Sequence, residues 1–397
     1  MWYSRIIEEA IEKSLPSPEA LILYGPRRVG KTSLLRHFEN TIKPLAPTAY
    51  FSLDDPGTRA IFNDFSLARL ETLFHGMGFA AGSKNYLFLD EILYFERVEL
   101  LLKLIVDNFP HVKILASSSS SLLLKKSLSE SLAGRKLFLE LLPLSLGELY
   151  HLSGKNFFQF PEQPLHFPVL ASAAEEMIVY GSYPEIVLLQ DQRERRAKLR
   201  DLVESALFKD IFMLEGIRHP RALSDLLTLL AHQAGSLVNV NEIASTLGIS
   251  RRLVDEYITI LEKFFVLFRL LPYSHNPRTE VGSRFKIYFW DQGIRNSIIN
   301  RFDPIQNRED RGALLENLVI AGIARRNLYS GRPYQQFFWR SYTGYEVDCV
   351  LEGIEKKELF AIEVKFSGKG KITRAFDAYN PDRKLIAGFE NCYRFCL

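Results

Sequence analysis

One short run of residues constrains the fold of this chain more than any other. The segment Gly25–Thr32 reads GPRRVGKT and follows the pattern G-x-x-x-x-G-K-[ST]. It lies between the apolar run Ala20–Tyr24 and a helical stretch that starts at Ser33. Two glycines let such a loop fold tightly, so that its backbone N–H groups point at phosphate oxygens near the positive end of a helix. The sequence therefore predicts a strand, a phosphate-binding loop (P-loop) and a helix.

The loop also predicts its ligands, ATP and Mg²⁺. Lys31 is expected to neutralise charge on the β- and γ-phosphates, and the Thr32 hydroxyl is expected to bind Mg²⁺. Because hydrolysis needs this charge stabilisation, Lys31 is also a candidate catalytic residue. The residues expected to bind the nucleotide are Gly25, Pro26, Arg27, Arg28, Val29, Gly30, Lys31, Thr32 and Ser33.

An acidic pair supplies the second half of the predicted site. The apolar run Tyr86–Asp90 ends in Asp90 and is followed by Glu91. An acid at the carboxyl end of a parallel strand faces the ligand crevice of an open α/β sheet. Asp90 is therefore expected to hold Mg²⁺, directly or through water, and Glu91 to orient and deprotonate the attacking water.

Two further features near this site have alternative explanations. A serine run, Ser117–Ser121, follows the strand Val112–Ala116, and one of its hydroxyls is expected either to touch the γ-phosphate or to belong to a plain polar loop. Arg135 ends the next helical segment. It is either a surface cation or a catalytic arginine that stabilises transition-state charge, in its own subunit or in a neighbouring copy. Action on a neighbouring copy would require a homo-oligomer.

The pattern along the chain predicts an α/β protein in four parts. In residues 1–150, short apolar runs alternate with helical stretches, which is typical of a parallel sheet with helices on both faces. Residues 151–215 are expected to form a helical connector, and residues 216–300 a winged helix-turn-helix with its turn at Gly248 and a second helix capped by Ser250. Residues 301–397 return to α/β character. The strands expected in the first part are Ala20–Tyr24, Thr48–Leu53, Tyr86–Asp90, Val112–Ala116 and Lys136–Leu141.

Composition excludes several classes of protein. The 50 basic and 47 acidic residues nearly balance, so overall charge favours no particular partner. The three cysteines form no zinc-binding pattern and are expected to be reduced thiols. No signal peptide and no run of about 18 apolar residues is present, which predicts a cytoplasmic protein without a membrane partner.

Several of these motifs resemble a large prokaryotic family of AAA-type ATP-binding proteins, in which an N-terminal AAA module joins a C-terminal domain of unknown function. The resemblance covers nearly the whole chain and implies a winged helix followed by a restriction-endonuclease-like module. One departure is the sequence Ala116–Ser119, where that family usually has Thr-Gly-Ser-Ser. The similar segments are Leu23–Ser33, Leu53–Pro56, Leu89–Glu91, Ala133–Arg135 and Gly181–Glu185.

The last part of the chain carries a second candidate site. Asp348 and Glu363 lie in two predicted strands with the spacing D-x(14)-E-x-K, as in PD-(D/E)xK nucleases, and Lys365 shares a strand face with Glu363. Glu316, on a preceding helix, is expected to support them. Two carboxylates can hold Mg²⁺ or Mn²⁺, which activates water against a phosphodiester, with the lysine steadying the developing charge. The alternative is a salt-bridged scaffold.

Two functions remain open at this stage. In the first, ATP controls a nuclease-like module that cuts or binds nucleic acid. In the second, slow ATP hydrolysis drives a regulatory switch, and a catalytically inactive C-terminal domain binds a protein partner. Arg251 and Arg252 start the second helix of the predicted helix-turn-helix, where a DNA-binding helix would contact DNA. The same element serves as a packing module in the alternative.

Overall fold

The chain folds into two compact units in a computed structural model that describes residues 3–119, 132, 134–150, 167–208, 211–212, 217–274, 284–341 and 343–396. The N-terminal unit is Arg5–Leu142, and the C-terminal unit is Pro143–Leu397 together with Met1–Ser4. The division between the two units falls after Leu142. Just beyond it, Leu144 N–H donates to Ser182 O and Leu146 N–H donates to Cys396 O, both in the C-terminal unit.

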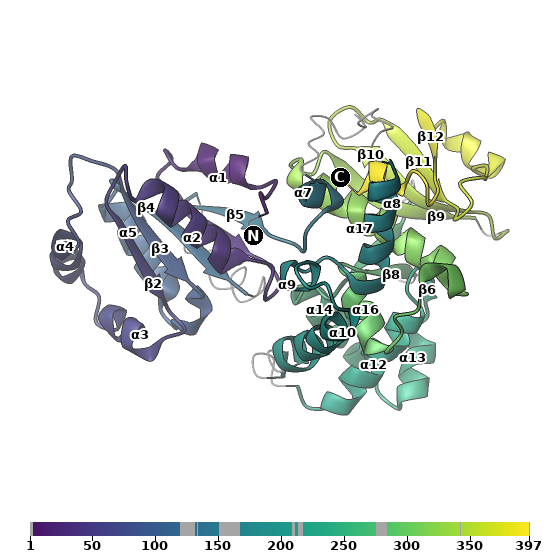
Figure 1. The fold of residues 1–397 in the computed structure, drawn as a ribbon, viewed down its shortest axis with the longest axis horizontal. Helices are drawn as coiled ribbons and strands as arrows, with labels where there is room; N and C mark the ends of the chain where they lie inside the picture. Colours follow the sequence, from purple (N-terminus) through teal and green to yellow (C-terminus); the bar gives the residue numbers. More distant parts are fainter. Residues whose placement is uncertain are drawn as a thin grey trace. The chain divides into compact units, whose positions relative to one another are not determined.

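The N-terminal unit is built on a five-stranded parallel sheet with the order β2-β3-β4-β1-β5 (Figure 1). Each predicted strand is present with bounds within two residues of those expected. Because β4 pairs with both β1 and β3, it separates the strand before the P-loop from the strand before the acidic pair. The strands are β1 (Ala20–Tyr24), β2 (Thr48–Ser52), β3 (Asn85–Asp90), β4 (Val112–Ser118) and β5 (Lys136–Glu140).

Both faces of the centre of this sheet are covered. Every residue of β1 and of β4 is buried, although side chains alternate between the two faces along a strand. Helices packed on both faces explain this burial and the continuous apolar character of the strands. The helices are α1 (Glu8–Ser14), α2 (Lys31–Ile42), α3 (Pro56–Phe62), α4 (Leu67–Gly76) and α5 (Val98–Asn108), with a 3-10 turn, η1 (Ile92–Tyr94).

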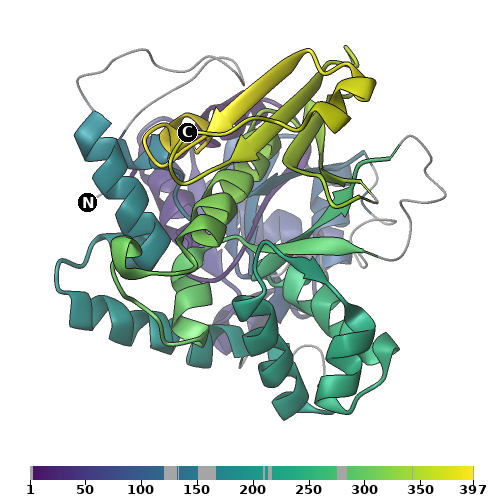
Figure 2. The ribbon, with the colours of Figure 1, turned by 90° about the vertical axis from the view of Figure 1, so that its right-hand side faces the viewer.

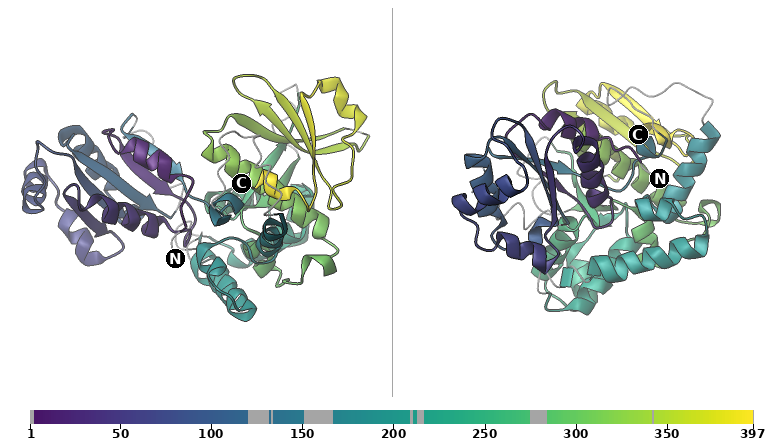
Figure 3. Two further views of the ribbon diagram at one scale, coloured as in Figure 1. Left: turned by 45° about the horizontal axis from the view of Figure 1, so that its top comes forward. Right: turned by 60° about the vertical axis from the view of Figure 1, so that its left-hand side comes forward.

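The C-terminal unit contains one seven-stranded sheet with the order β12-β11-β10-β9-β7-β8-β6 (Figures 2 and 3). The long helix α17 (Arg311–Tyr329) packs against β8 and β11 and contributes Leu315, Val319 and Ile323 to the core. The strands are β6 (Leu237–Val238), β7 (Leu267–Pro272), β8 (Phe285–Phe289), β9 (Tyr334–Arg340), β10 (Glu346–Gly353), β11 (Leu359–Val364) and β12 (Arg383–Ala387).

The remaining helices lie before, between and after these strands. None of the helices among the described residues is long and apolar enough to cross a membrane. The helices are α7 (Leu146–Tyr150), α8 (Phe167–Tyr180), α9 (Pro184–Val187), α10 (Gln192–Asp201), η3 (Leu202–Phe208), α12 (Pro220–His232), α13 (Val240–Leu247), α14 (Arg251–Lys263), α16 (Gln292–Ile298), η4 (Ile305–Asn307), η5 (Arg374–Tyr379) and η6 (Cys392–Phe395).

The predicted helix-turn-helix is present as α13 and α14. Gly248 ends α13 in a left-handed conformation with φ 64°, and the Ser250 hydroxyl caps α14 by accepting from Leu253 N–H. The strand after α14, β7, begins at Leu267. Phe265 has a φ of 59°, and the N–H groups of Phe265 and Val266 still donate to carbonyls of α14, so the chain turns before it extends.

Candidate nucleotide-binding site

The P-loop backbone requires a glycine at its first position. Gly25 has a φ of 156°, and a Cβ built there would lie 2.0 Å from the carbonyl oxygen of Leu141, the residue after β5. At the other end of the loop, Gly30 is left-handed, with φ 99°, and forms the N-cap of α2. A side chain at either glycine would strain or displace the loop. The tight turn inferred from the two glycines is therefore present.

Lys31 lies over the loop that precedes it. Its Nζ donates to the carbonyl oxygens of Gly25 at 3.0 Å and Pro26 at 2.8 Å, and the residue is 4% exposed. Lys31 is also the first residue of α2, so the positive end of the helix lies at the loop. Thr32 and Ser33 are exposed beside it. Lys31 and the helix end thus place positive charge at one small site.

The side chain of Asp90 is held by two hydroxyl groups. Tyr50 Oη donates to Asp90 Oδ2 at 2.7 Å, and Ser117 Oγ donates to Asp90 Oδ1. Asp90 is 2% exposed. Burial, followed by the hydrogen bond to Asp90, raises the pKa of Tyr50 above its usual value, so the phenol stays protonated as a donor. This arrangement fixes the carboxylate at the carboxyl end of β3.

Glu91, the next residue, has a strained backbone. Its φ is 52° and its ψ is 51°, a left-handed conformation that costs a non-glycine residue about 1–3 kcal/mol. Its N–H donates to Ser117 Oγ at 3.0 Å. Its Oε2 atom is buried and has no hydrogen-bond partner among the described residues. Strain of this kind gathers at functional sites, and the unpartnered oxygen is suited to accept a proton or bind water.

The structure distinguishes among the serines of Ser117–Ser121. Ser117 is the one that contacts both acidic residues, because β4 lies next to β3 in the sheet. Ser118 lies opposite Tyr24, the residue before the P-loop. Ser120 and Ser121 lie outside the described residues. The strand order, which the sequence did not reveal, places the start of the serine run between the P-loop and the acidic pair.

Arg135 lies at the amino-terminal end of the strands, whereas the P-loop and the acidic pair lie at their carboxyl-terminal end. Its carbonyl accepts from Ala20 N–H, and Lys136 lies opposite Ala20, so Arg135 is level with the start of β1. The P-loop follows the end of β1, about 13 Å farther along at 3.3 Å per residue. Arg135 Nε contacts Asp107 Oδ1 at 2.5 Å. The structure therefore does not bring Arg135 to the P-loop of its own subunit, and the role in a neighbouring copy stays a prediction.

Three residues near this site had no recognisable signal in the sequence: Tyr50, Tyr94 and Arg5. Tyr50 is a β2 residue that reaches the β3 carboxylate, and Arg27 Nη2 contacts Tyr94 Oη at 3.0 Å. Arg5 is 6% exposed and donates to two carbonyl oxygens, Val29 O in the P-loop at 2.8 Å and Leu142 O at 2.6 Å. Each contact joins segments that are far apart in the sequence.

The second candidate site, in the C-terminal unit, brings its residues together. Asp348 Oδ2 accepts from Val364 N–H at 2.7 Å, and the pairing of Cys349 with Ile362 places Asp348 opposite Glu363 on one sheet face. Lys365 Nζ lies 2.7 Å from Glu363 Oε1. Burial raises the pKa of both Asp348 and Glu363, so the protein environment disfavours their charged forms.

A lysine missed by the sequence analysis lies among these carboxylates. Lys286 of β8 is almost fully buried, and its Nζ lies 3.1 Å from Glu316 Oε1 and forms a close ion pair with Glu346. Tyr288 Oη also donates to Glu316 Oε1, at 2.6 Å. Burial raises the pKa of Glu316 to about 7. Lys286 thus places positive charge beside Glu316, the carboxylate that was expected to support the metal site.

The expected metal-binding set is not preformed. Within the part of the chain that the structure describes, no group of three or more His, Cys, Asp or Glu residues is placed to hold a metal ion. The metal site predicted at Asp348 and Glu363, with Glu316 in support, therefore stays a prediction. Lysine ammonium groups lie against two of these carboxylates, Lys286 against Glu316 and Lys365 against Glu363.

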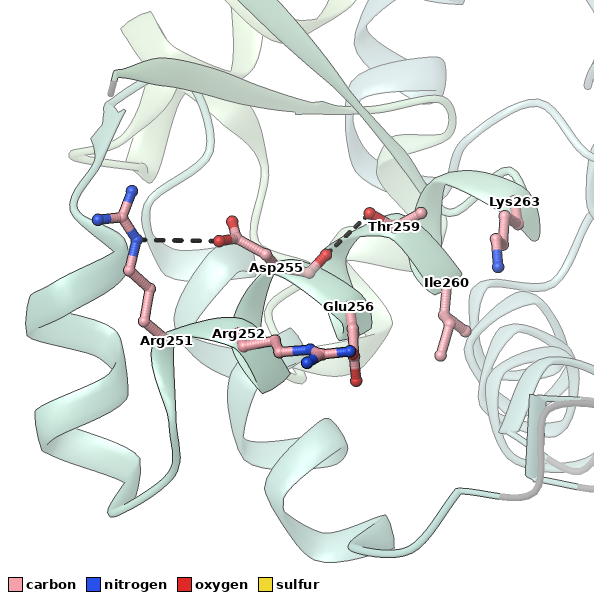
Figure 4. A pocket seen from close by; sticks show the side chains of 7 residues that line it. All are labelled: Arg251, Arg252, Asp255, Glu256, Thr259, Ile260 and Lys263. Atoms are coloured by element: carbon pink, nitrogen blue, oxygen red, sulfur yellow. Dashed lines mark hydrogen bonds and ion pairs between the residues drawn. The ribbon is translucent and has the colours of Figure 1, made fainter. Parts of the chain in front are cut away.

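The two arginines at the start of α14 are each paired with an acidic residue of the same helix. Arg251 lies 3.9 Å from Asp255, and Arg252 lies 3.0 Å from Glu256, each pair one helical turn apart (Figure 4). All four side chains line the same surface pocket. Contacts to DNA phosphates depend on an excess of positive charge. The two arginines predicted to face DNA therefore do not form a basic patch by themselves.

Comparison with protein families places the N-terminal unit. Residues 17–150 match the AAA domain family. Together with the P-loop and the parallel sheet, this match identifies residues 17–150 as an AAA-type P-loop domain. Residues 172–304 match a domain of unknown function, DUF8612, and residues 311–395 match another, DUF4143.

Similar proteins were found among both curated and solved proteins. An uncharacterized protein of Methanocaldococcus jannaschii is 27% identical over 395 residues, which cover 96% of this chain and 83% of the relative. The Holliday junction branch migration motor RuvB of Thermotoga maritima has a TM-score of 0.32 and 18% identity, with 70% of this chain and 91% of that chain covered. AMPPCP-bound DnaA of Aquifex aeolicus has a TM-score of 0.29 and 18% identity, with 66% and 89% covered.

Proposed function

We propose that this chain is a Mg²⁺-dependent ATPase whose nucleotide state controls its C-terminal unit. The observation that carries the proposal is the arrangement at the carboxyl edge of the parallel sheet. There the P-loop follows β1, Asp90 is the last residue of β3, and Glu91 follows Asp90. Strand β4 lies between β1 and β3, and its residue Ser117 contacts both acidic residues. A site with these parts can bind phosphates, a divalent ion and an attacking water together.

Each residue has a defined chemical role in this proposal. Lys31 and the loop N–H groups bind the phosphates, and the exposed Thr32 hydroxyl binds Mg²⁺. Asp90 acts on Mg²⁺ through water, since both of its oxygens already accept hydrogen bonds from protein hydroxyls. Glu91 accepts the proton of the attacking water at its unpartnered Oε2. Arg135 acts on a neighbouring copy of the chain.

We further propose that the C-terminal unit binds a partner and does not cut nucleic acid. The elements α12–α14 with β6–β8 fit a winged helix, and α17 followed by β9–β12 fits a nuclease-like α/β fold. The observation that favours binding over cleavage is Lys286, which compensates Glu316 and Glu346 without a metal ion. Metal-dependent cleavage by Asp348, Glu363 and Lys365 is the alternative, because the two carboxylates do lie on one sheet face.

The ATPase proposal is tested with Lys31→Ala and a matched control, Lys43→Ala. Both lysines belong to the region of α2, but Lys43 is exposed at its far end. Lys31→Ala should lose detectable hydrolysis and bind Mg-ATP weakly, whereas Lys43→Ala should behave as the wild type. A folded Lys31→Ala protein with unchanged ATP affinity and turnover would reject the proposal.

The role of the C-terminal unit is tested by incubating DNA with the protein in Mg²⁺ or Mn²⁺, with and without ATP. We expect no cleavage, and we expect any effect of DNA to appear in the ATPase rate. Cleavage by the wild type that disappears in Asp348→Ala would establish the nuclease alternative. Cleavage that persists in Asp348→Ala would indicate a contaminating enzyme.

A further inference from the structure

The chain passes between its two units at two places. Residues Met1–Ser4 belong to the C-terminal unit, so the first crossing lies between Ser4 and Arg5. The second crossing lies between Leu142 and Pro143. Any motion of one unit relative to the other must bend the chain at the second crossing, where Leu142 is covalently joined to Pro143. Residues that contact this crossing are therefore placed to control such a motion.

One side chain joins both crossings to the P-loop. Arg5 is itself the first residue after the first crossing, and its Nη2 donates to the carbonyl oxygen of Leu142, the last residue before the second, at 2.6 Å. Its Nη1 donates to Val29 O at 2.8 Å. The Arg5 N–H donates to Glu8 Oε1 at 2.5 Å, which fixes the backbone at the start of α1. A planar guanidinium holds two such acceptors in a fixed geometry, which a single ammonium does not.

The contact with Val29 can respond to the nucleotide. Val29 C=O and Gly30 N–H belong to one planar trans peptide group, so they point in opposite directions. In a P-loop the N–H groups point at phosphate oxygens. When the N–H side of a peptide group binds an anion, its carbonyl becomes a better acceptor, because linked hydrogen bonds polarise one another. Phosphate binding therefore strengthens the hydrogen bond from Arg5 on the other side of the same group.

Beyond the second crossing the chain is held tightly. Leu144 N–H donates to Ser182 O at 3.0 Å, and Leu144 O accepts from Arg325 Nη1 at 3.2 Å. Ser145 and Glu148 then form a reciprocal pair, with Ser145 N–H donating to Glu148 Oε2 at 2.8 Å and Glu148 N–H donating to Ser145 Oγ at 3.0 Å. Pro143 alone separates Leu142 from the first of these hydrogen-bonded residues, Leu144. A shift of the Leu142 carbonyl is therefore passed on to the C-terminal unit.

We propose that Arg5 is a positioning residue that couples nucleotide occupancy of the P-loop to the joint at Leu142–Pro143. The proposal rests on nucleotide binding at the P-loop, as set out above. Arg5 takes no part in the chemistry of hydrolysis. It makes the segment that enters the C-terminal unit sensitive to the state of the Val29–Gly30 peptide.

The test is amide hydrogen exchange with and without Mg-AMPPCP, read in two peptides of the full-length chain. One peptide spans the P-loop, residues 25–35, and the other the joint, residues 142–149. In the wild type we expect the nucleotide to slow exchange in both peptides. For the joint we expect about fivefold or more, the lower end of ordinary coupling between sites. Arg5→Met should keep the response of the P-loop and lose that of the joint.

Two further variants complete the design. Arg5→Lys keeps the charge but not the two-armed geometry, and it should lose most of the response at the joint. Arg69→Met removes a guanidinium from an arginine whose side chain is 68% exposed in the same unit, and it should match the wild type. If Arg5→Met does not fold, Arg5→Lys is read in its place.

Each outcome separates the two proposals. No response of the wild-type P-loop would reject nucleotide binding itself. A P-loop response without a response at the joint would reject only the coupling. The coupling is also rejected if Arg5→Met retains the response at the joint, or if it loses the response of the P-loop as well, because Arg5 would then only build the loop.

Discussion

Ser117→Ala removes the hydroxyl that connects the two acidic residues of the nucleotide site. That hydroxyl donates to Asp90 Oδ1 and accepts from Glu91 N–H at 3.0 Å. After the substitution, Asp90 retains its hydrogen bond from Tyr50 but loses a donor in a site where it is 2% exposed. Glu91, already in a left-handed conformation, loses the acceptor that fixes its backbone. We expect the general base to become misplaced.

The size of the effect follows from the charge of Asp90. A hydrogen bond to a charged group contributes about 1.5–3 kcal/mol net. Since 1.36 kcal/mol corresponds to a factor of ten in rate, we expect kcat/KM for ATP to fall by about 10- to 150-fold. The loss should lie mainly in kcat, because Glu91 acts on the water and not on the bound nucleotide.

The assay is steady-state phosphate release by Ser117→Ala and Ser118→Ala. Neighbouring residues of a strand point to opposite faces of the sheet, so Ser118→Ala removes the same hydroxyl group from the other face and serves as the control. Ser118→Ala should lose less activity. Wild-type kcat in a folded Ser117→Ala protein, or an equal loss in both variants, would refute the assignment of Ser117.

Four other predictions follow from the same structure. Glu91→Gln should bind Mg-ATP by calorimetry but lose about 10²-fold or more in kcat, and normal turnover would assign the base elsewhere. If Arg135 acts on a neighbouring copy, hydrolysis per subunit should rise with protein concentration and Arg135→Ala should flatten that rise; a constant wild-type rate excludes this role. Lys286→Met should destabilise the C-terminal unit by about 3–5 kcal/mol, because it removes the buried ammonium group that pairs with Glu316 and Glu346. Denaturant unfolding followed by tryptophan fluorescence measures this, since all three tryptophans lie outside Arg5–Leu142, and a change below about 1 kcal/mol contradicts it. Burial lowers the pKa of Lys113 from 10.5 to about 8, so between these pH values the unfolded chain holds a proton that the folded chain has lost. The free energy of unfolding of the N-terminal unit, measured by calorimetry, should therefore increase as the pH is raised from about 8 to 10.5, and Lys113→Met should abolish this increase.

The local parts of the nucleotide site were predictable from the sequence. The strand, the loop and the helix around Gly25–Thr32 are consecutive, and glycine spacing with apolar runs specifies them directly. The role of Ser117 was not predictable, because it depends on β4 lying between β1 and β3. Tyr50 and Arg5 were missed for the same reason. Their contacts depend on pairing between distant segments, which leaves no pattern in a single sequence.

The C-terminal site shows the same limit. The spacing of Asp348, Glu363 and Lys365 indicated a shared sheet face, and the register of β10 and β11 places them there. Lys286 gave no signal, because one lysine in the apolar run Phe285–Phe289 is ordinary for a strand. Its partner Glu316 lies 30 residues away on a helix. Only the packing of α17 against β8 reveals that a lysine of the chain pairs with Glu316.

The continuous sheet of the C-terminal unit has a consequence for how such chains are inherited. Two separate family matches meet near residue 305, yet β9 beyond that point pairs directly with β7 before it, as Phe337 lies opposite Leu271. A gene rearrangement that transferred only residues 311–395 would leave β9 as a new open edge of the sheet. It would also separate Glu316 and Glu346 from Lys286, the lysine that pairs with them. Open edges of this kind recruit other chains. Recombination should therefore preserve residues 172–395 as a single heritable block, although the two family matches divide this region into two domains.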